Sequence, residues 1–294
     1  MCYTPTLSRT LGVTIRLANL IFSANSVLNR AITSRYLSRM VFTTKSRRRE
    51  RLRAEPFPDH WRRIVEVRVP VFGRLSVEDR QELLGHARVL LEEKHFEGAG
   101  GLLMRDEVRL TVAAQAALLL LHRDTDYFPR LKSIIVYPTG YVASETTRDE
   151  GGIWTEGDES LLGHTQRDLR AIVLAWDEVR AGAADPDDGH NLVLHEFAHQ
   201  LDFEDGSTDG TPALDSGAQV RSWAQVMGDE LEALRRSADA GEPTLLDPYG
   251  AEDPAEFFAV ATETFFERAS QLERRHPQLY DELRRFYRQD PARW

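Results

Sequence analysis

The chain has 294 residues and a mass of 33.5 kDa, long enough for one large domain or two small ones. Hydrophobic residues make up 41% and charged residues 29%, which is typical of a folded soluble protein and excludes a fibrous or wholly disordered one. Cys2 is the single cysteine, so an intrachain disulfide and a cysteine zinc cluster are both excluded. We therefore expect a cytoplasmic protein in which any metal site uses His, Asp or Glu.

The opening of the chain differs from the rest in charge. Residues 1–45 contain six basic residues and no Asp or Glu, whereas residues 46–294 contain 31 Lys and Arg against 47 acidic residues, a formal charge of −16. An acidic body repels phosphates, so nucleic acid is not an expected partner. We interpret 1–45 first as a translated upstream region before a start at Met40, and then as a disordered tail. A transit-type segment and a poor signal peptide are weaker interpretations.

No apolar run approaches the roughly 18 residues that a membrane-spanning helix needs. The longest candidate, Ala113 to Leu121, is nine residues long and contains Gln115. We therefore expect no membrane span.

Hydrophobic periodicity predicts two helices before residue 130. Apolar positions recur at helical spacing from Ser76 to Glu93, and the Ala- and Leu-rich run from Arg105 to His122 predicts a helix buried on most sides. The glycines between them, at 98, 100 and 101, predict a turn. These glycines do not form a phosphate-binding loop, because no apolar strand precedes them and no Gly-Lys-Ser/Thr sequence follows them. We assign residues 46–130 to a helical N-terminal part.

The remainder, 131–294, is predicted to be a catalytic part with a small sheet followed by helices. Ser133–Tyr137 and Ala171–Trp176 are short β-branched runs typical of buried strands, and an edge strand is expected near 153–156. The fold class is therefore α+β. The helices expected after the sheet are 191–203, capped by Asn191, and 219–234, 254–268 and 277–287.

The string His195-Glu196-Phe197-Ala198-His199 carries the strongest chemical signal. Residues four apart on a helix project from the same face, so both imidazoles can bind one tetrahedral Zn²⁺. Such an ion activates a water molecule, and Glu196 can reach that water as general base. Apolar residues cover most of the rest of this helix, and burying two His and a Glu without partners would be costly. The pattern therefore favours metal-assisted amide hydrolysis.

A catalytic zinc site needs a third protein ligand. One peptidase pattern has a Gly three residues after the second histidine and a His three residues further on, but this chain has Asp202 and Asp205 at those positions. A second pattern places an Asp after a Gly-Thr pair, and Asp215 lies one residue too late for it. Glu256, in the first turn of the helix that begins after Asp253, faces the same way as Glu263, seven residues later. One can be the ligand and the other can support a ligand histidine. Spacing alone does not choose between them.

Longer strings resemble the Mlc titration factor A family of zinc peptidases. The resemblance covers nearly everything after the run of basic residues at 45–53. The matching residues are Lys94 to Gly98 with Gly101, Val136 to Pro138, His195 to Asp202, Asp253 to Val260 with Glu263, Phe265 and Phe266, and Phe286 to Pro291.

Membership implies a gluzincin core similar to that of anthrax lethal factor, in a zincin-like metallopeptidase fold. The resemblance implies His195, His199 and Glu256 as zinc ligands and Glu196 as the acid/base, and thus selects Glu256 over Glu263. Glu263 and Asp202 are then expected to lie beside the ligands and support them. By analogy with related zinc peptidases, Tyr249 is a candidate donor to the oxyanion.

Two functions follow as hypotheses. The first is a zinc-dependent peptidase acting on peptides or proteins and linked, as the resemblance implies, to control of sugar uptake. The second is a protein that sequesters a transcriptional repressor and keeps a structural zinc site. Glu196 favours the enzyme, because a structural site has a closed coordination shell and needs no base.

Overall fold

The computed structural model describes residues 44–144, 147–148, 154–155, 158–161, 163–166 and 170–294. It divides the chain into two compact units, residues 1–52 and 53–294. Within the described residues, 44–54 are helical. Positions 1–43, with the expected upstream region or tail, lie outside the described residues.

The second unit begins with three helices and a 3-10 turn. Ser76 caps the second helix by accepting a hydrogen bond from Asp79 N, at 3.0 Å. The third helix is buried over ten of its residues, and the two helices before it pack against it. The elements are α2 (Asp59–Arg68), η1 (Pro70–Arg74), α3 (Val77–Glu93) and α4 (Asp106–Leu118).

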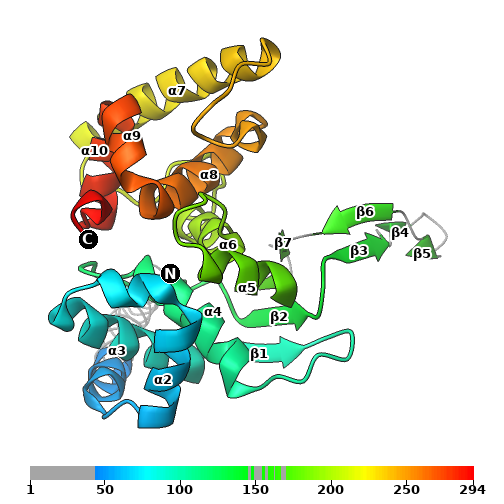
Figure 1. Ribbon diagram of the computed structural model, residues 1–294, viewed down its shortest axis with the longest axis vertical. Coiled ribbons are helices and arrows are strands. Elements are labelled where there is room, and N and C mark those ends of the chain that lie inside the picture. The colour runs from blue at the N-terminus through cyan, green and yellow to red at the C-terminus, as the bar shows by residue number, and fades with distance from the viewer. Residues whose placement is uncertain (1–43, 145–146, 149–153, 156–157, 162, 167–169) are drawn as a thin grey trace, which may run out of the picture. The chain divides into compact units, whose positions relative to one another are not determined.

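A four-stranded sheet has the order β1-β2-β8-β7, and its strands β1 and β2 lie side by side in Figure 1. The first three strands are parallel, and β7 pairs with β8 in the antiparallel sense. Every residue of β8 is buried. The strands are β1 (His95–Gly98), β2 (Ser133–Tyr137), β7 (Gly163–Gln166) and β8 (Ala171–Ala175), and two small antiparallel pairs join β3 (Tyr141–Ser144) to β6 (Asp158–Leu161) and β4 (Thr147–Arg148) to β5 (Trp154–Thr155).

Helices make up the rest of the unit after β8. Helices α6 and α8 lie side by side, and α8 also packs against η3 and α7 (Figure 1). The elements are α5 (Trp176–Ala184), α6 (Leu192–Asp202), α7 (Gly217–Asp239), η3 (Pro248–Ala251), α8 (Pro254–Glu267), α9 (Ala269–Arg275), α10 (Pro277–Tyr287) and η4 (Pro291–Arg293).

An aromatic cluster anchors α8 to its neighbours. Trp223, Phe258 and Phe286 contact one another edge to face, with ring centroids 5.5–5.8 Å apart. Phe265 stacks on Tyr287 at 5.6 Å, and both side chains are fully buried. Such pairs add about 0.5–1.5 kcal/mol each beyond the area they bury. The helix that carries the candidate third ligand is thus held rigidly.

The α+β prediction is confirmed in part: the unit is largely helical and has a small sheet whose first three strands are parallel. Helices α3, α6, α8 and α10 and strand β2 match their predicted ranges within one or two residues. The predicted helix 105–122 is too long, because α4 ends at Leu118. The predicted strand 171–176 is one residue too long, because Trp176 begins α5.

Several elements were not predicted from the sequence: the helices α2, α5 and α9 and the strands β1, β3, β4, β6 and β7. The expected glycine turn exists, since Gly100 and Gly101 have φ of +58° and +85°, but the short strand β1 precedes it. At the end of this strand, a Cβ on Gly98 would lie 2.1 Å from Leu102 O, so only glycine fits there. Within the described residues, no helix is both long enough and apolar enough to cross a membrane.

Candidate metal centre

Helix α6 presents two histidines from consecutive turns. It begins after Asn191, whose Oδ1 accepts a hydrogen bond from Leu194 N at 3.1 Å. Nine of its eleven residues are buried, including Glu196, Phe197 and His199. The apolar residues fix this helix in the core, and the polar ones have to share the face that remains.

Helix α8 supplies the carboxylates on the opposite side. Asp253 Oδ1 accepts hydrogen bonds from Ala255 N at 2.8 Å and Glu256 N at 2.9 Å, and Pro254 occupies the first helical position. These features start the helix just before Glu256. Seven residues are nearly two turns, so Glu256 and Glu263 both face α6. Both reach His195.

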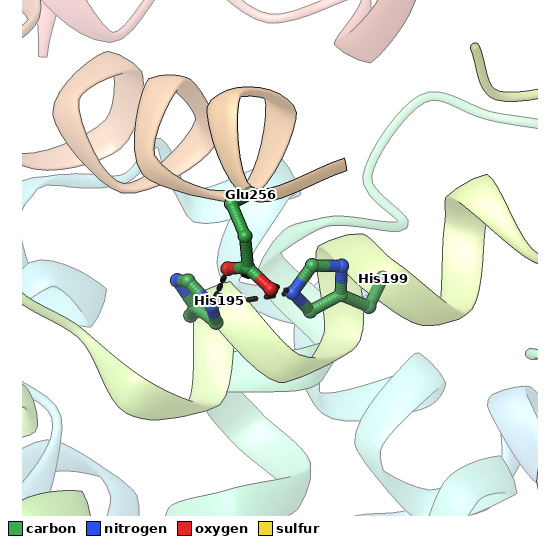
Figure 2. A group of neighbouring side chains, drawn as sticks. All are labelled: His195, His199 and Glu256. Carbon is green, nitrogen blue, oxygen red and sulfur yellow. Dashed lines mark hydrogen bonds and ion pairs between the residues drawn. The ribbon is translucent and has the colours of Figure 1, made fainter. Parts of the chain in front are cut away.

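Three ligand atoms converge on one point between α6 and α8 (Figure 2). Glu256 Oε2 lies 3.0 Å from His195 Nε2 and 3.4 Å from His199 Nε2. The two Nε2 atoms are 3.2 Å apart. The side chains are 13%, 6% and 17% exposed for His195, His199 and Glu256, so the point is largely shielded from solvent.

This group fits a metal ion. Ligands at about 2.0–2.1 Å from a tetrahedral ion lie about 3.3 Å from one another, close to the observed 3.0–3.4 Å. Glu256 Oε2 is buried and makes no well-directed hydrogen bond, and the two histidines beside it offset its charge only when one of them is protonated. A divalent cation at the shared point would offset that charge permanently.

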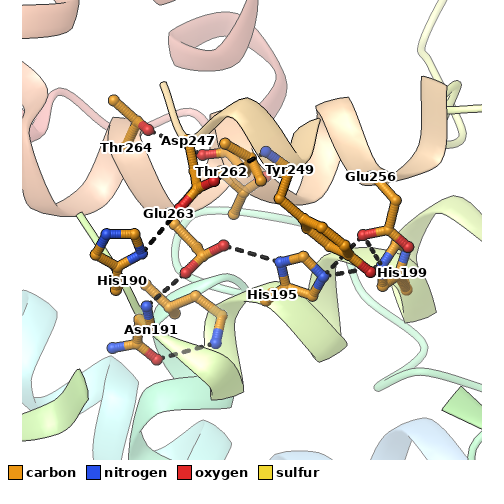
Figure 3. Close-up of polar contacts among 12 residues, drawn as sticks. His190, Asn191, His195, His199, Asp247, Tyr249, Glu256, Thr262, Glu263 and Thr264 are labelled. Atoms are coloured by element: carbon orange, nitrogen blue, oxygen red, sulfur yellow. Dashed lines mark hydrogen bonds and ion pairs between the residues drawn. The ribbon is translucent and has the colours of Figure 1, made fainter. Parts of the chain in front are cut away.

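The two histidines differ on the side away from the shared point. Glu263 Oε1 lies 2.8 Å from His195 Nδ1, which directs His195 Nε2 toward Glu256 (Figure 3). This is the usual arrangement of a carboxylate behind a ligand histidine. His199 Nδ1 is buried without a hydrogen-bond partner among the described residues.

The carboxylates and histidines of the group shift one another's pKa values. Burial lowers the pKa of His195, but the contacts with Glu256 and Glu263 outweigh it and raise the pKa to about 10. Burial raises the pKa of Glu256, but the two histidines outweigh it and hold that pKa far below its usual value. Without an ion, a proton on His195 thus balances the carboxylates.

Glu196 and Tyr249 both lie near this group. Glu196 is 3% exposed, and its charge contributes to raising the pKa of both His195 and Tyr249. The Tyr249 ring centroid is 6.0 Å from that of His195, and the side chain is 48% exposed (Figure 3). Tyr249 lies on η3, where Asp247 Oδ1 accepts a hydrogen bond from Tyr249 N at 2.8 Å.

Asp202 ends α6 and holds a loop. Its Oδ2 accepts a hydrogen bond from Gly210 N at 3.0 Å, and burial raises the pKa of the carboxyl to about 6. Gly210 has φ of +74°, and a Cβ there would lie 2.3 Å from Pro254 O at the start of α8. Trp223 Nε1 donates to Gly210 O at 2.9 Å. Asp202 thus supports the position of α8 and is outside the group of three.

One polar residue of this region was missed by the sequence reasoning. Glu267 is buried and accepts hydrogen bonds from Gly189 N at 3.0 Å and Asn191 Nδ2 at 2.9 Å. Its spacing from Glu256 and Glu263, 11 and 4 residues, puts all three on one helix face. That periodicity was the available signal.

Two histidines from one helix, the glutamate between them and a carboxylate from a second helix make up the residue set of a metallopeptidase centre. The model of the glucose-regulated metallo-peptidase M90 family matches residues 43–288, and the chain belongs to this family.

Three relatives illustrate the similarity. The chain is 38% identical to the Synechocystis protein slr2042 over 244 residues, which is 83% of this chain and 89% of the relative. It is 33% identical over 238 residues to Mlc titration factor A of Pectobacterium atrosepticum, covering 79% and 87%. Identity to Mlc titration factor A of Yersinia pestis is 30% over 228 residues, covering 76% and 82%.

Proposed function

We propose that this chain is a zinc-dependent peptidase in which His195, His199 and Glu256 hold the ion. The observation that carries the proposal is the convergence of three ligand atoms, within 3.4 Å of one another, beside the buried Glu196. Two imidazoles and one carboxylate are a ligand set that zinc peptidases use, and it leaves one position open. We also propose a gluzincin-type core similar to that of anthrax lethal factor.

The ion, when bound, would polarise the peptide carbonyl and make water easier to deprotonate. Glu196 accepts the proton of the attacking water and returns it to the leaving amine. Glu196 is 3% exposed, so this carboxylate is shielded from bulk water. The buried walls contributed by α6 exclude bulk water.

Tyr249 donates its hydroxyl hydrogen to the oxyanion that develops on the carbonyl. Burial, with help from Glu256, Glu252 and Glu196, raises the pKa of Tyr249 to about 12, so the donor stays protonated across the neutral range. Its half-exposed position beside His195 leaves room for a substrate to reach it.

Two further acids support the ligands. Glu263 fixes the His195 ring through Nδ1, and Asp202 holds the Gly210 loop against the start of α8. Neither contacts the reacting atoms in this proposal. Both keep Glu256 and the two histidines in the positions that binding of one ion requires.

The proposal is tested with the purified full chain. Metal analysis should find one zinc per chain, and a peptide panel with free and acetylated N-termini should show cleavage and separate aminopeptidase from endopeptidase action. Glu196→Gln should keep the zinc and lower kcat at least about 100-fold. A wild type that cleaves none of the peptides, or an equally active variant, would refute the enzyme.

A second function is favoured by the names of the relatives. Two of them are called Mlc titration factor A. We propose that this chain also binds a transcriptional repressor of the Mlc type, in the cytoplasm, and thereby influences sugar uptake. Calorimetric titration of such a repressor with wild type and with Glu196→Gln tests this. Equal binding by both supports a surface away from the catalytic group, and no binding by either refutes the proposal.

A further inference from the structure

Three glutamates form a line along α8 on the face that contacts α6. Glu256 faces both histidines, Glu263 contacts His195 Nδ1, and Glu267 reaches the segment just before α6. Glu263 and Glu267 are 7% and 6% exposed. Such a line of buried carboxylates is costly unless each has donors, so the donors of the last one are informative.

Asn191 supplies donors to Glu263 and Glu267 and also caps α6, and Figure 3 shows it beside Glu263. Its backbone N–H donates to Glu263 Oε2 at 2.5 Å, and its Nδ2 donates to Glu267 Oε1 at 2.9 Å. Its Oδ1 accepts from Leu194 N. One residue therefore joins the start of the histidine helix to two turns of α8.

The surroundings leave Asn191 little freedom. It is 5% exposed, and a Cβ on Gly182 would lie 3.0 Å from Asn191 Cα. Gly182 O accepts a second hydrogen bond from Nδ2 at 3.3 Å. Glu267 is fixed from its other side by Gly189 N at 3.0 Å. The contact between Asn191 and Glu267 is therefore held in one geometry.

We propose that Asn191 and Glu267 are positioning residues for the metal centre. Their hydrogen bond fixes Asn191, the Asn191 N–H fixes Glu263, and Glu263 orients the His195 ring so that Nε2 points at Glu256. The inference rests on the proposed metal site but not on peptidase activity. It extends the support of His195 two residues beyond Glu263, first to Asn191 and then to Glu267.

The decisive variant is Asn191→Asp in the full chain. Aspartate still caps α6 through a carboxylate oxygen, but it cannot donate to Glu267 and places an acid beside it. We expect the Zn²⁺ affinity, measured by competition with a chelating dye, to fall at least about tenfold, the usual effect of losing outer support of a ligand. In metal-free protein, the NMR signal of the His195 Nδ1–H should shift or disappear through exchange with water.

A double variant that exchanges the donor and the acceptor between positions 191 and 267 tests the hydrogen bond itself. In Asn191→Asp with Glu267→Gln, the glutamine carbonyl can accept from Gly189 N while its amide donates to the aspartate. We expect this double variant to recover most of the lost affinity and the His195 signal, and Glu267→Leu alone, which has no acceptor for Asn191 Nδ2, to show the loss. A double variant no better than Asn191→Asp, together with unchanged affinity in Glu267→Leu, would assign the loss to the aspartate itself, beside Gly182 O, and would overturn the proposal.

Glu282→Gln is the matched control. Glu282 is 2% exposed on α10 and accepts hydrogen bonds from Ser222 and Arg285, so its substitution also disturbs a buried carboxylate. It should leave the His195 signal and the Zn²⁺ affinity unchanged.

If Asn191→Asp does not fold, Glu267→Leu decides, since leucine has no acceptor for Asn191 Nδ2 and the cap is not touched. An unchanged His195 signal and unchanged affinity in that variant would refute the inference. A wild type that binds Zn²⁺ without cleaving peptides would instead refute only the proposed enzyme. A wild type that binds no Zn²⁺ would refute the metal site and with it this inference.

Discussion

Two groups of acids and histidine in this chain look alike by composition but differ in geometry. His195, His199 and Glu256 form one, and Asp79, Glu82 and His122 form the other, each with ligand atoms within 4.8 Å. In the first, two Nε2 atoms and one carboxylate oxygen share a single buried point.

In the second group, the two nitrogens of His122 face different carboxylates. His122 Nε2 lies 3.0 Å from Asp79 Oδ1, and Nδ1 lies 3.4 Å from Glu82 Oε2. Glu82 Oε1 also accepts from His122 N at 3.0 Å and lies 3.2 Å from His86 Nε2. The His122 side chain is 42% exposed. The difference teaches that a metal centre needs ligand atoms aimed at one point, and proximity alone gives ion pairs.

The largest expected effect is on the first group. His199→Ala should abolish retention of zinc and peptide cleavage, because a three-ligand site that loses an imidazole no longer encloses the ion. Metal analysis after dialysis measures zinc retention, and the peptide panel measures cleavage. Adding Zn²⁺ should raise the Tm of the wild type and leave that of the variant unchanged. Full zinc retention by the variant would place the ion elsewhere.

A smaller loss of Zn²⁺ affinity is expected when Glu263, which contacts the ligand His195, is substituted. In Glu263→Gln, the glutamine oxygen can accept a hydrogen bond from either His195 Nδ1 or Asn191 N. The glutamine amide group then faces the remaining donor. We expect Zn²⁺ affinity to fall by about 10–100-fold. Competition with a chelating dye measures it, and an affinity within twofold of wild type would show that the contact with His195 has no role in metal binding.

The pH dependence of the metal-free protein sharpens the same contrast. The pKa of His195 is raised in the folded state from 6.5 to about 10, so its contribution to the free energy of unfolding is complete below pH 6.5 and is lost as pH rises toward 10. Urea titrations at pH 6.5, 8 and 9.5 should show this fall. The free energy of unfolding should fall less steeply with pH in Glu263→Gln than in the wild type. An equally steep fall in both would refute the assignment of this pH dependence to His195.

The smallest effect is expected in the second group. His122→Ala should leave the Zn²⁺ affinity unchanged and lower the free energy of unfolding by about 0–1 kcal/mol, the range of exposed ion pairs. Dye competition and urea titration measure the two quantities. A tenfold loss of zinc affinity would show that composition, and not convergence, identifies the site.

The local part of this site could be predicted from the sequence, since helical spacing alone places His195 and His199 on one face and Glu256 and Glu263 on another. The choice between the two glutamates could not be derived that way. They contact opposite nitrogens of one imidazole, Glu256 at Nε2 and Glu263 at Nδ1, and that depends on how α8 packs on α6.

The elements that were missed have physical reasons too. β1 has only four residues, of which His95 and Glu97 are exposed, so it has no apolar alternation to detect, and it exists because it pairs with β2. α2 lacks a side-chain cap and has a single buried residue, Val65. Such elements are defined by tertiary contacts, which local patterns do not encode.

The most direct test of the metal centre is a titration of the full chain with Zn²⁺, followed by NMR of nitrogen-labelled histidines. The account predicts that one equivalent shifts the Nε2 signals of His195 and His199 and leaves those of His122 in place. A saturating shift at His122, or none at His195 and His199, would contradict it.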